Sequence, residues 1–243
     1  MRSDAAELAD ALRDPEALLA SASILKDSRS TKAGVATWPG DPARKPRLFV
    51  KRHNIKSRIH AAKYAFRTPR AFREFRASAR IEALGLPTPR PLAALATKRR
   101  AGLFPGPSYF VAEAVEGAVP TLDFLRAAFS DEALASEYVS AVAGFLARMH
   151  DAGVIHGDAK CSNFFAAKTV DCYAFGLWDL LSCRFRGAPA GDAEREKEIG
   201  RFADSLAAIA ERLSMELPET ASRQSILDAY AANGSTTEKE ASK

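Results

Sequence analysis

The stretch Val154-Ile155-His156-Gly157-Asp158-Ala159-Lys160-Cys161-Ser162-Asn163 decides the fold of this chain. Asp158 and Asn163 lie five residues apart in a loop and can face one site. There the carboxylate can accept a hydroxyl proton, while the amide oxygen can bind a divalent metal. Asp179 ends an apolar, hairpin-like stretch over 173–178 and is the candidate for a second oxygen ligand. Two such ligands together with phosphate oxygens suit magnesium.

Upstream of this loop, residues 130–150 predict a long helix that ends at Gly153. Ser130 is the expected N-cap, and Asp131 and Glu132 suit the positive end of the helix dipole. The apolar positions recur at helical spacing: Leu134, Tyr138, Val142, Phe145, Leu146 and Met149.

A second helix is predicted over about 69–84, with Thr68 as its N-cap and Gly85 just past its end. Its apolar positions are Phe72, Phe75, Ala79 and Ala83. Before it, residues 47–51 predict a strand with Leu48 and Val50 on one face, and Lys51 ends that strand.

The remaining elements suggest two lobes. We expect a short helix broken by Pro15, a strand, polar loop and strand over 21–40, an extended proline-rich connection over 86–91, a strand over 108–113 and a helix over 192–211. The predicted fold is α+β and two-lobed, with ligands between the lobes. The predicted parts are a strand-rich N-lobe with one main helix over 1–115, including an extension over 1–22, a mostly helical C-lobe over 116–233, and a polar tail over 234–243.

The composition is that of a globular protein: 243 residues, 47% apolar, with 35 Lys and Arg against 30 Asp and Glu. It excludes collagen, coiled coils and wholesale disorder. No apolar run is long enough to span a membrane. Asp4, Glu7 and Asp10 lie where a signal peptide would have its apolar core, so a cytoplasmic location is expected. Three cysteines, eleven residues apart, are expected to be reduced thiols and not zinc ligands.

The positive charge is concentrated in one segment. Residues 44–80, here called the basic block, hold thirteen Lys or Arg and a single acid, Glu74. Such a block attracts polyanions, among them nucleic acid, anionic lipid head groups and phosphorylated glycans, or it forms a solvated basic face. No zinc-finger, RNP or leucine-zipper pattern accompanies it, which argues against nucleic acid.

The loop resembles the catalytic loop of the protein-kinase-like superfamily, H-x-D-x-K-x-x-N, with His156, Asp158, Lys160 and Asn163 in register. This resemblance implies that Asp158 is the catalytic base and that Lys160 steadies the transferred phosphoryl group. It further implies that Asn163 and Asp179 hold Mg²⁺, and that His156 braces the loop by hydrogen bonding.

The same resemblance assigns nucleotide-binding roles. Lys51 is similar to the phosphate-binding lysine, and Glu74 to its ion-pair partner on the following helix. Residues 113–116 match the hinge that offers backbone groups to adenine, which implies ATP contacts at Glu113 and Val115.

The match narrows to one family. Four segments of the chain are similar to the bacterial lipopolysaccharide core kinases. They are Lys51-Arg52-His53-Asn54, residues 70–79, residues 84–92 and the His-Gly-Asp form of the loop. That resemblance implies an ATP- and Mg²⁺-dependent transfer of phosphate to a heptose or Kdo hydroxyl. The acceptor would be a lipid-linked core oligosaccharide. The basic block, Arg44 to Arg80, would then contact the anionic inner face of the cytoplasmic membrane, making the enzyme peripheral there.

Two features depart from the kinase pattern. No G-x-G-x-x-G precedes Lys51, so residues 28–34, with Arg29 and Lys32, are left to cover the phosphates. The family commonly has Asp-Leu-Asp at the second metal site, whereas this chain has Asp179-Leu180-Leu181. The alternatives are a RIO-like protein kinase, a small-molecule phosphotransferase, or a catalytically inactive kinase-like binding module.

Overall fold

The structure, a computed structural model, describes residues 2–55, 67–98 and 105–240. The chain divides into two compact units. The first comprises residues 1–82 and 89–116, and the second comprises residues 83–88 and 117–243. None of the helices within the described residues is long and apolar enough to cross a membrane.

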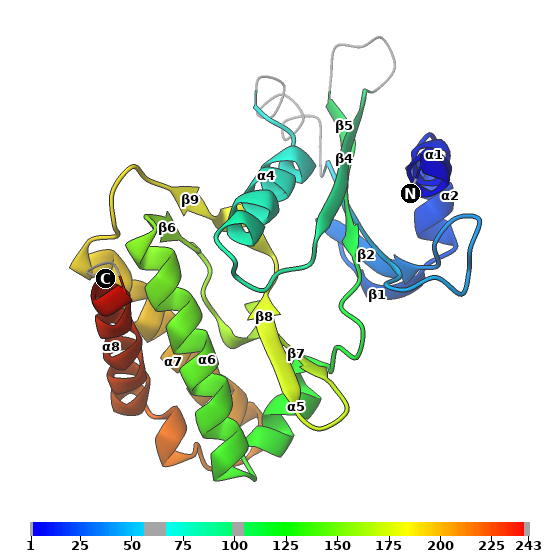
Figure 1. The fold of residues 1–243 in the computed structure, drawn as a ribbon. Coiled ribbons are helices and arrows are strands. Elements are labelled where there is room, and N and C mark those ends of the chain that lie inside the picture. The colour runs from blue at the N-terminus through cyan, green and yellow to red at the C-terminus, as the bar shows by residue number, and fades with distance from the viewer. Residues whose placement is uncertain (1, 56–66, 99–104, 241–243) are drawn as a thin grey trace. The chain divides into compact units, whose positions relative to one another are not determined.

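The first unit contains a five-stranded antiparallel sheet in the order β1-β2-β3-β5-β4 (Figure 1). Its strands are β1 (Ser23–Asp27), β2 (Thr31–Ala36), β3 (Leu48–His53), β4 (Pro91–Lys98) and β5 (Pro105–Glu113). Four of them lie where the sequence predicts strands. The fifth, β4, begins at the end of the expected proline-rich connection. Pro91 is tolerated there because β4 is an edge strand and Pro91 is its first residue.

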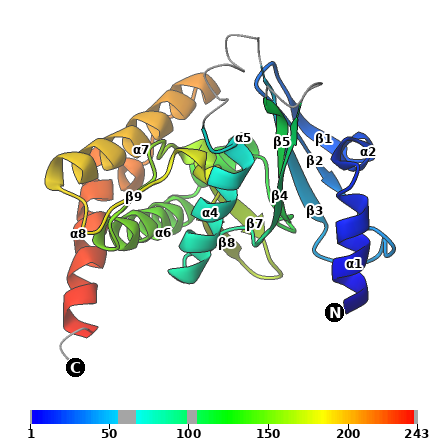
Figure 2. The same cartoon turned by 90° about the horizontal axis from the view of Figure 1, so that it is seen from above.

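The pleat of β3 sends its side chains to opposite faces of the sheet. Leu48 and Val50 are fully buried against the N-terminal helices, in a cluster with Leu18, Leu19, Trp38 and Val111. The opposite face is covered by α4 (Arg70–Ala83), whose Ala71 packs on Phe110 and Ala112 of β5. Figure 2 shows α4 on one side of the sheet and the N-terminal helices on the other.

The N-terminal helices are α1 (Arg2–Ala11) and α2 (Pro15–Ala20). The break predicted at Pro15 is therefore present. Pro15 starts α2, and the Asp14 carboxylate accepts a hydrogen bond from the Ala17 N–H at 3.0 Å. This cap fixes where α2 begins and so which of its residues reach the sheet.

The second unit is mainly helical. Its helices are α5 (Thr121–Ala128), α6 (Glu132–Asp151), α7 (Asp192–Leu213) and α8 (Arg223–Glu240), with short 3-10 turns η1 (Cys161–Asn163), η2 (Leu180–Ser182) and η3 (Glu219–Ala221). Two small antiparallel pairs join β6 (Val154–Ile155) to β9 (Arg184–Phe185) and β7 (Phe164–Lys168) to β8 (Tyr173–Leu177).

Helix α6 carries the predicted apolar stripe. Tyr138, Val142, Leu146 and Met149 are buried, and the other two predicted positions are half-buried. The predicted N-cap is wrong by one residue: Asp131 caps the helix by accepting from the N–H groups of Ala133 and Leu134. Ser130 instead bonds the Arg126 carbonyl of α5, at 3.2 Å.

Two helices differ from the prediction. The sequence analysis assigned no helix to α5, which begins after Pro120 and buries Phe124 and Leu125. Helix α8 continues through Gly234 to Glu240, where the polar composition predicts a separate tail.

Candidate active site

A buried carboxylate joins β3 to α4 in the first unit. Lys51 Nζ donates to Glu74 Oε1 at 2.7 Å, and His53 Nε2 donates to Glu74 Oε2 at 2.8 Å. Burial raises the pKa of Glu74, but the Lys51 charge and the His53 hydrogen bond outweigh it and hold that pKa below its ordinary value. The structure thus brings Lys51 and Glu74 together, and it adds His53, which the sequence analysis did not single out.

The two predicted adenine contacts lie at the end of β5. The Glu113 N–H donates to the Arg90 carbonyl at 2.9 Å, and the Ala114 N–H donates to the Arg47 carbonyl at 2.7 Å. These bonds fix the backbone that leads to Val115, which is half-buried. Adenine binding by this segment stays a prediction.

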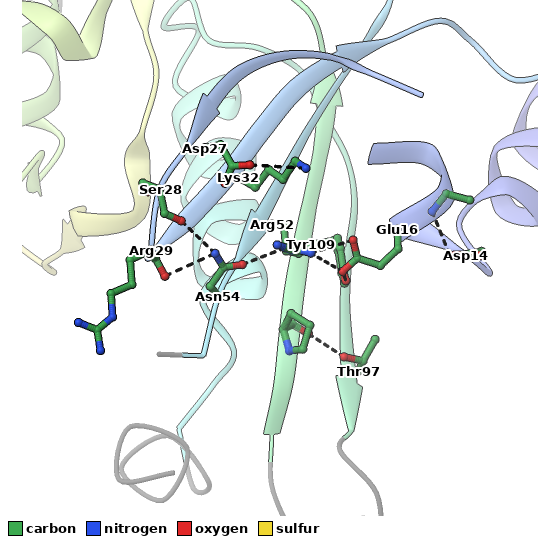
Figure 3. A network of polar contacts seen from close by, with 12 residues as sticks. Asp14, Glu16, Asp27, Ser28, Arg29, Lys32, Arg52, Asn54, Thr97 and Tyr109 are labelled. Atoms are coloured by element: carbon green, nitrogen blue, oxygen red, sulfur yellow. Dashed lines mark hydrogen bonds and ion pairs between the residues drawn. The ribbon is translucent and has the colours of Figure 1, made fainter. Parts of the chain in front are cut away.

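The turn between β1 and β2 contains the start of the segment over 28–34 that is expected to cover the phosphates. The Ser28 N–H and Oγ each donate to the Thr31 carbonyl at 2.9 Å. The Asn54 side chain donates to the carbonyls of Ser28 and Arg29, at 3.2 and 3.5 Å (Figure 3). Of the two predicted phosphate contacts, Lys32 pairs with Asp27 at 3.6 Å, whereas Arg29 is exposed and extends away from the turn.

Arg52 connects this turn to α2 (Figure 3). Its Nε donates to Asn54 Oδ1 at 2.8 Å, and its Nη1 donates to both Glu16 oxygens, at 2.7 and 2.9 Å. Glu16 also accepts from the hydroxyl of buried Tyr109. Partial burial raises the pKa of Glu16, but the bonds from Tyr109 and Arg52 lower it below its ordinary value. A continuous polar chain therefore runs from the N-terminal helix to the turn.

Asp158, Lys160 and Asn163 converge in the second unit. Lys160 Nζ lies 2.9 Å from Asp158 Oδ2, and Asn163 Nδ2 donates to the same oxygen at 3.1 Å. The Asn163 amide also donates to the Asp158 carbonyl at 2.8 Å. The single 3-10 turn η1 makes this possible because it returns the chain over five residues toward Asp158.

The Asp158 carboxylate is ionised at neutral pH. Partial burial raises its pKa, but Lys160, Asn163 and the charge of Arg201 together lower it below the ordinary value. Its side chain is 36% exposed, so a substrate hydroxyl can reach it. An exposed, ionised carboxylate can orient and deprotonate an alcohol.

One face of α7 holds the backbone of this loop. Glu198 accepts from the N–H groups of His156 and Gly157, at 2.7 and 2.6 Å. Ser205 Oγ accepts from the Cys161 N–H at 2.8 Å. Arg201 donates to the Gly157 carbonyl and lies 3.6 Å from Asp158 Oδ1.

These three α7 residues were not predicted from the sequence. The signal for them was their spacing of three and four inside a predicted helix, which places them on one face. That spacing does not reveal which backbone segment they bond, because this segment lies more than 40 residues earlier in the chain.

Gly157 is required at its position. Its φ is +81°, and a Cβ there would lie 2.4 Å from the Ser182 carbonyl oxygen. Any side chain would therefore be strained and would push the loop from η2. This explains why the loop reads His-Gly-Asp.

His156 braces the loop differently from the prediction. Its ring is fully buried and packs 5.7 Å from the Phe164 ring, and its two ring nitrogens have no hydrogen-bond partner within the described residues. The hydrogen bond comes from its backbone N–H to Glu198. Burial lowers the pKa of the His156 imidazole below its ordinary value, so the ring is neutral at neutral pH.

Asp179 lies at the end of β8 with a left-handed φ of +55°, unusual for a residue with a side chain. Backbone strain of this kind clusters at functional sites. The segment before it is tied to the loop: the Trp178 N–H donates to the Asn163 carbonyl at 3.1 Å, and Trp178 Nε1 donates to the Ser162 carbonyl at 2.8 Å. Burial lowers the pKa of the His156 ring, while the charges of Glu198, Asp158 and Asp179 act in the opposite direction.

The oxygen donors fit the predicted magnesium. Asn163 turns its Nδ2 toward Asp158, so Oδ1 is directed away from that carboxylate, and Asp179 contributes an exposed carboxylate. Hard oxygen ligands of this kind suit Mg²⁺, which retains waters and binds substrate phosphates as well. Within the part of the chain that the structure describes, no three His, Cys, Asp or Glu residues are grouped as an all-protein metal site.

The basic block is not one uniform surface. Lys51 is buried beside Glu74, Arg52 pairs with Glu16, and the Arg44 guanidinium stacks 3.9 Å from the centre of the Trp38 ring. On α4, Arg73, Arg76 and Arg80 are exposed and lie three and four residues apart on one helix face. The part of the block over 56–66 lies outside the described residues.

A sheet carrying a buried Lys–Glu pair and a helical unit carrying the His-Gly-Asp-x-Lys-x-x-Asn loop define a protein-kinase-like protein. Residues 37–225 match the lipopolysaccharide kinase (Kdo/WaaP) family. The chain belongs to this family. It is therefore a kinase, a phosphotransferase that acts on a sugar of the lipopolysaccharide inner core, as the resemblance implied.

Individual relatives agree with this assignment. The chain is 26% identical over 171 residues to a 3-deoxy-D-manno-octulosonic acid kinase of Actinobacillus succinogenes, covering 69% of this chain and 68% of the relative. A kinase of the same name from Haemophilus influenzae is 25% identical over 146 residues, covering 57% of this chain and 58% of the relative.

A solved structure, described as WaaP in complex with acyl carrier protein, has the same fold. Its TM-score is 0.59 at 19% identity, over 90% of this chain and 81% of the solved one. The predicted α+β kinase-like fold is thereby confirmed.

Proposed function

We propose that this chain transfers the γ-phosphoryl group of ATP to a hydroxyl of Kdo, 3-deoxy-D-manno-octulosonic acid, in the lipid-linked lipopolysaccharide core. The observation that supports it best is Asp158, an ionised and accessible carboxylate held between Lys160 and Asn163. The relatives with Kdo kinase activity in their names support Kdo over heptose.

In this proposal the chain's residues act mainly by positioning. A carboxylate with a lowered pKa is a weak base, so Asp158 orients the acceptor hydroxyl and takes its proton late in the transfer. Lys160 neutralises charge on the transferred phosphoryl group, and Lys51, held by Glu74, binds the nucleotide phosphates. Glu113 and Val115 offer backbone groups to adenine.

Asn163 and Asp179 would hold Mg²⁺. When bound there, the ion supplies positive charge to the phosphate oxygens. Leu181 cannot supply the second carboxylate that the family commonly has, so Asp179 is the acidic ligand in this arrangement.

The test is phosphate transfer to a Kdo-terminated acceptor, followed by mass spectrometry. Asp158→Ala should abolish transfer and keep nucleotide binding, whereas Lys51→Ala should weaken both. Asp171→Asn and Lys168→Ala, exposed residues in and beside the β7–β8 turn, are the matched controls. Equal transfer by Asp158→Ala and wild type would refute the role of Asp158.

An inactive kinase-like module remains the rival, because Leu181 replaces an acid. A thermal shift on addition of Mg-ATP separates the two, since a ligand stabilises only a fold that binds it. A thermal shift together with phosphate transfer supports the enzyme, whereas the absence of both supports the inactive module.

We also propose that the exposed arginines of α4, Arg73, Arg76 and Arg80, bind the anionic face of the cytoplasmic membrane. Each basic residue near such a surface contributes about 1 kcal/mol of attraction. Replacing all three by alanine should weaken binding to anionic vesicles, and wild-type binding should fall as salt rises. The charge-matched control replaces the exposed Arg126, Lys168 and Arg212. Salt-insensitive binding, or equal binding by both triple variants, would contradict the proposal.

A further inference from the structure

Arg201 bonds the loop backbone from α7 and also approaches the Asp158 carboxylate. Its Nη1 lies 3.6 Å from Asp158 Oδ1 and donates to the Gly157 carbonyl. Both contacts use the same nitrogen. The hydroxyl that receives phosphate must come within hydrogen-bond distance of Asp158, so any acceptor in place lies next to this guanidinium.

The guanidinium retains an unused edge. Apart from the two contacts of Nη1, Arg201 has no hydrogen bond or ion pair within the residues that the structure describes. Its Nε and Nη2 therefore have no partner there, and the side chain is 38% exposed. Two adjacent N–H donors in one plane match the two oxygens of a carboxylate.

The charges around Asp158 favour one more anion. Lys160 and Arg201 both approach this single carboxylate, so Asp158 alone does not balance both cations. The other nearby acids are already engaged in the proposed site: Glu198 accepts two backbone N–H groups and lies 3.3 Å from His150, and Asp179 is the proposed magnesium ligand. His156 is neutral and adds no charge.

We propose that Arg201 binds the carboxylate of an acid-sugar acceptor through Nε and Nη2, while Nη1 keeps its bond to the Gly157 carbonyl. This inference rests on the proposed function, and it identifies Arg201 as the group that distinguishes an acid sugar from a neutral one. The acceptor is then held at two points, its hydroxyl at Asp158 and its carboxylate at Arg201.

The experiment compares a Kdo-terminated acceptor with the same acceptor as its methyl ester. Wild type should prefer the acid, and Arg201→Ala should raise the KM for the acid roughly tenfold to a hundredfold, the worth of a charge-assisted hydrogen bond. The KM for the ester and the KM for ATP should change less than the KM for the acid, because neither ligand offers a carboxylate to Arg201 in this proposal. Arg212→Ala, in the last turn of α7, should retain wild-type values.

Arg201→Lys keeps the charge and a donor for Gly157 but removes the two-donor edge, so it should also lose much of the preference for the acid. Equal losses for acid and ester would show that Arg201 only positions the loop and would overturn the inference, as would an unchanged preference. If wild type phosphorylates neither acceptor, the proposed function itself fails, and this inference fails with it.

Discussion

The Arg52 guanidinium binds both carboxylate oxygens of Glu16, at 2.7 and 2.9 Å, and thereby connects the N-terminal helix α2 to strand β3. Through Asn54 the same guanidinium reaches the turn between β1 and β2. The geometry of this turn therefore depends on a helix outside the sheet.

Arg52→Ala should raise the KM for ATP if the turn covers the phosphates, because Asn54 loses the bond that orients its amide. The pair is partly exposed, so its loss should cost about 1 kcal/mol of stability, a fall in Tm of about 2–4 °C. Steady-state kinetics and a thermal melt measure both effects. Arg13→Ala removes an exposed Arg–carboxylate pair of the same unit, that with Asp10, and serves as the control. An unchanged KM for ATP in Arg52→Ala would show that the turn does not contribute to nucleotide binding.

Glu74→Ala should be far more damaging than loss of a surface acid. It would leave the buried Lys51 and His53 without their shared carboxylate, and breaking a buried pair typically costs about 3–5 kcal/mol. A large loss of stability on denaturant unfolding, together with loss of nucleotide binding, is expected. Glu82→Ala, exposed on the same helix, should unfold as wild type does.

Gly157→Ala should reduce kcat, because the new Cβ meets the Ser182 carbonyl and the residue has a positive φ. Strain of this kind costs of order 1–3 kcal/mol. Gly187→Ala, where no atom lies within 4 Å of an added Cβ, provides the comparison. Similar kinetics for the two variants would mean that the loop tolerates a side chain.

The Glu198 carboxylate predicts a pH dependence of stability. Burial raises its pKa, but His150 and the backbone N–H groups of the loop lower it below the ordinary value of 4.5. A carboxylate with a lowered folded-state pKa stabilises the fold above its ordinary value, and this contribution disappears as pH falls through the folded-state pKa.

Glu198→Gln should therefore be less stable than wild type at neutral pH, by about 1–3 kcal/mol, because its amide cannot accept both N–H groups. The difference should shrink progressively below pH 4.5. Urea unfolding across pH 3–7 checks this, with the exposed Glu211→Gln as control. A difference that stays constant over that range would rule out the carboxylate as its source.

The loop was predicted because its residues follow short, fixed spacings, and the Lys51–Glu74 pair was predicted from the resemblance to the kinase superfamily, with Lys51 on an expected strand and Glu74 on an expected helix. It did not predict Glu198, Arg201 or the Tyr109–Glu16 bond, since each joins positions more than 40 residues apart and leaves no local pattern. Helix α5 was missed because eight residues after a proline give little periodicity. Strand β4 was missed because its alanine-rich sequence has low strand propensity.

The dependence of the catalytic loop on Glu198 also bears on how this protein matures during translation. The chain is synthesised from its N-terminus, and His156 precedes Glu198 by 42 residues. On the ribosome the loop is therefore made well before the carboxylate that bonds its backbone, and a nascent chain that stops before α7 has every residue of the His-Gly-Asp motif but lacks the Glu198, Arg201 and Ser205 contacts to that backbone.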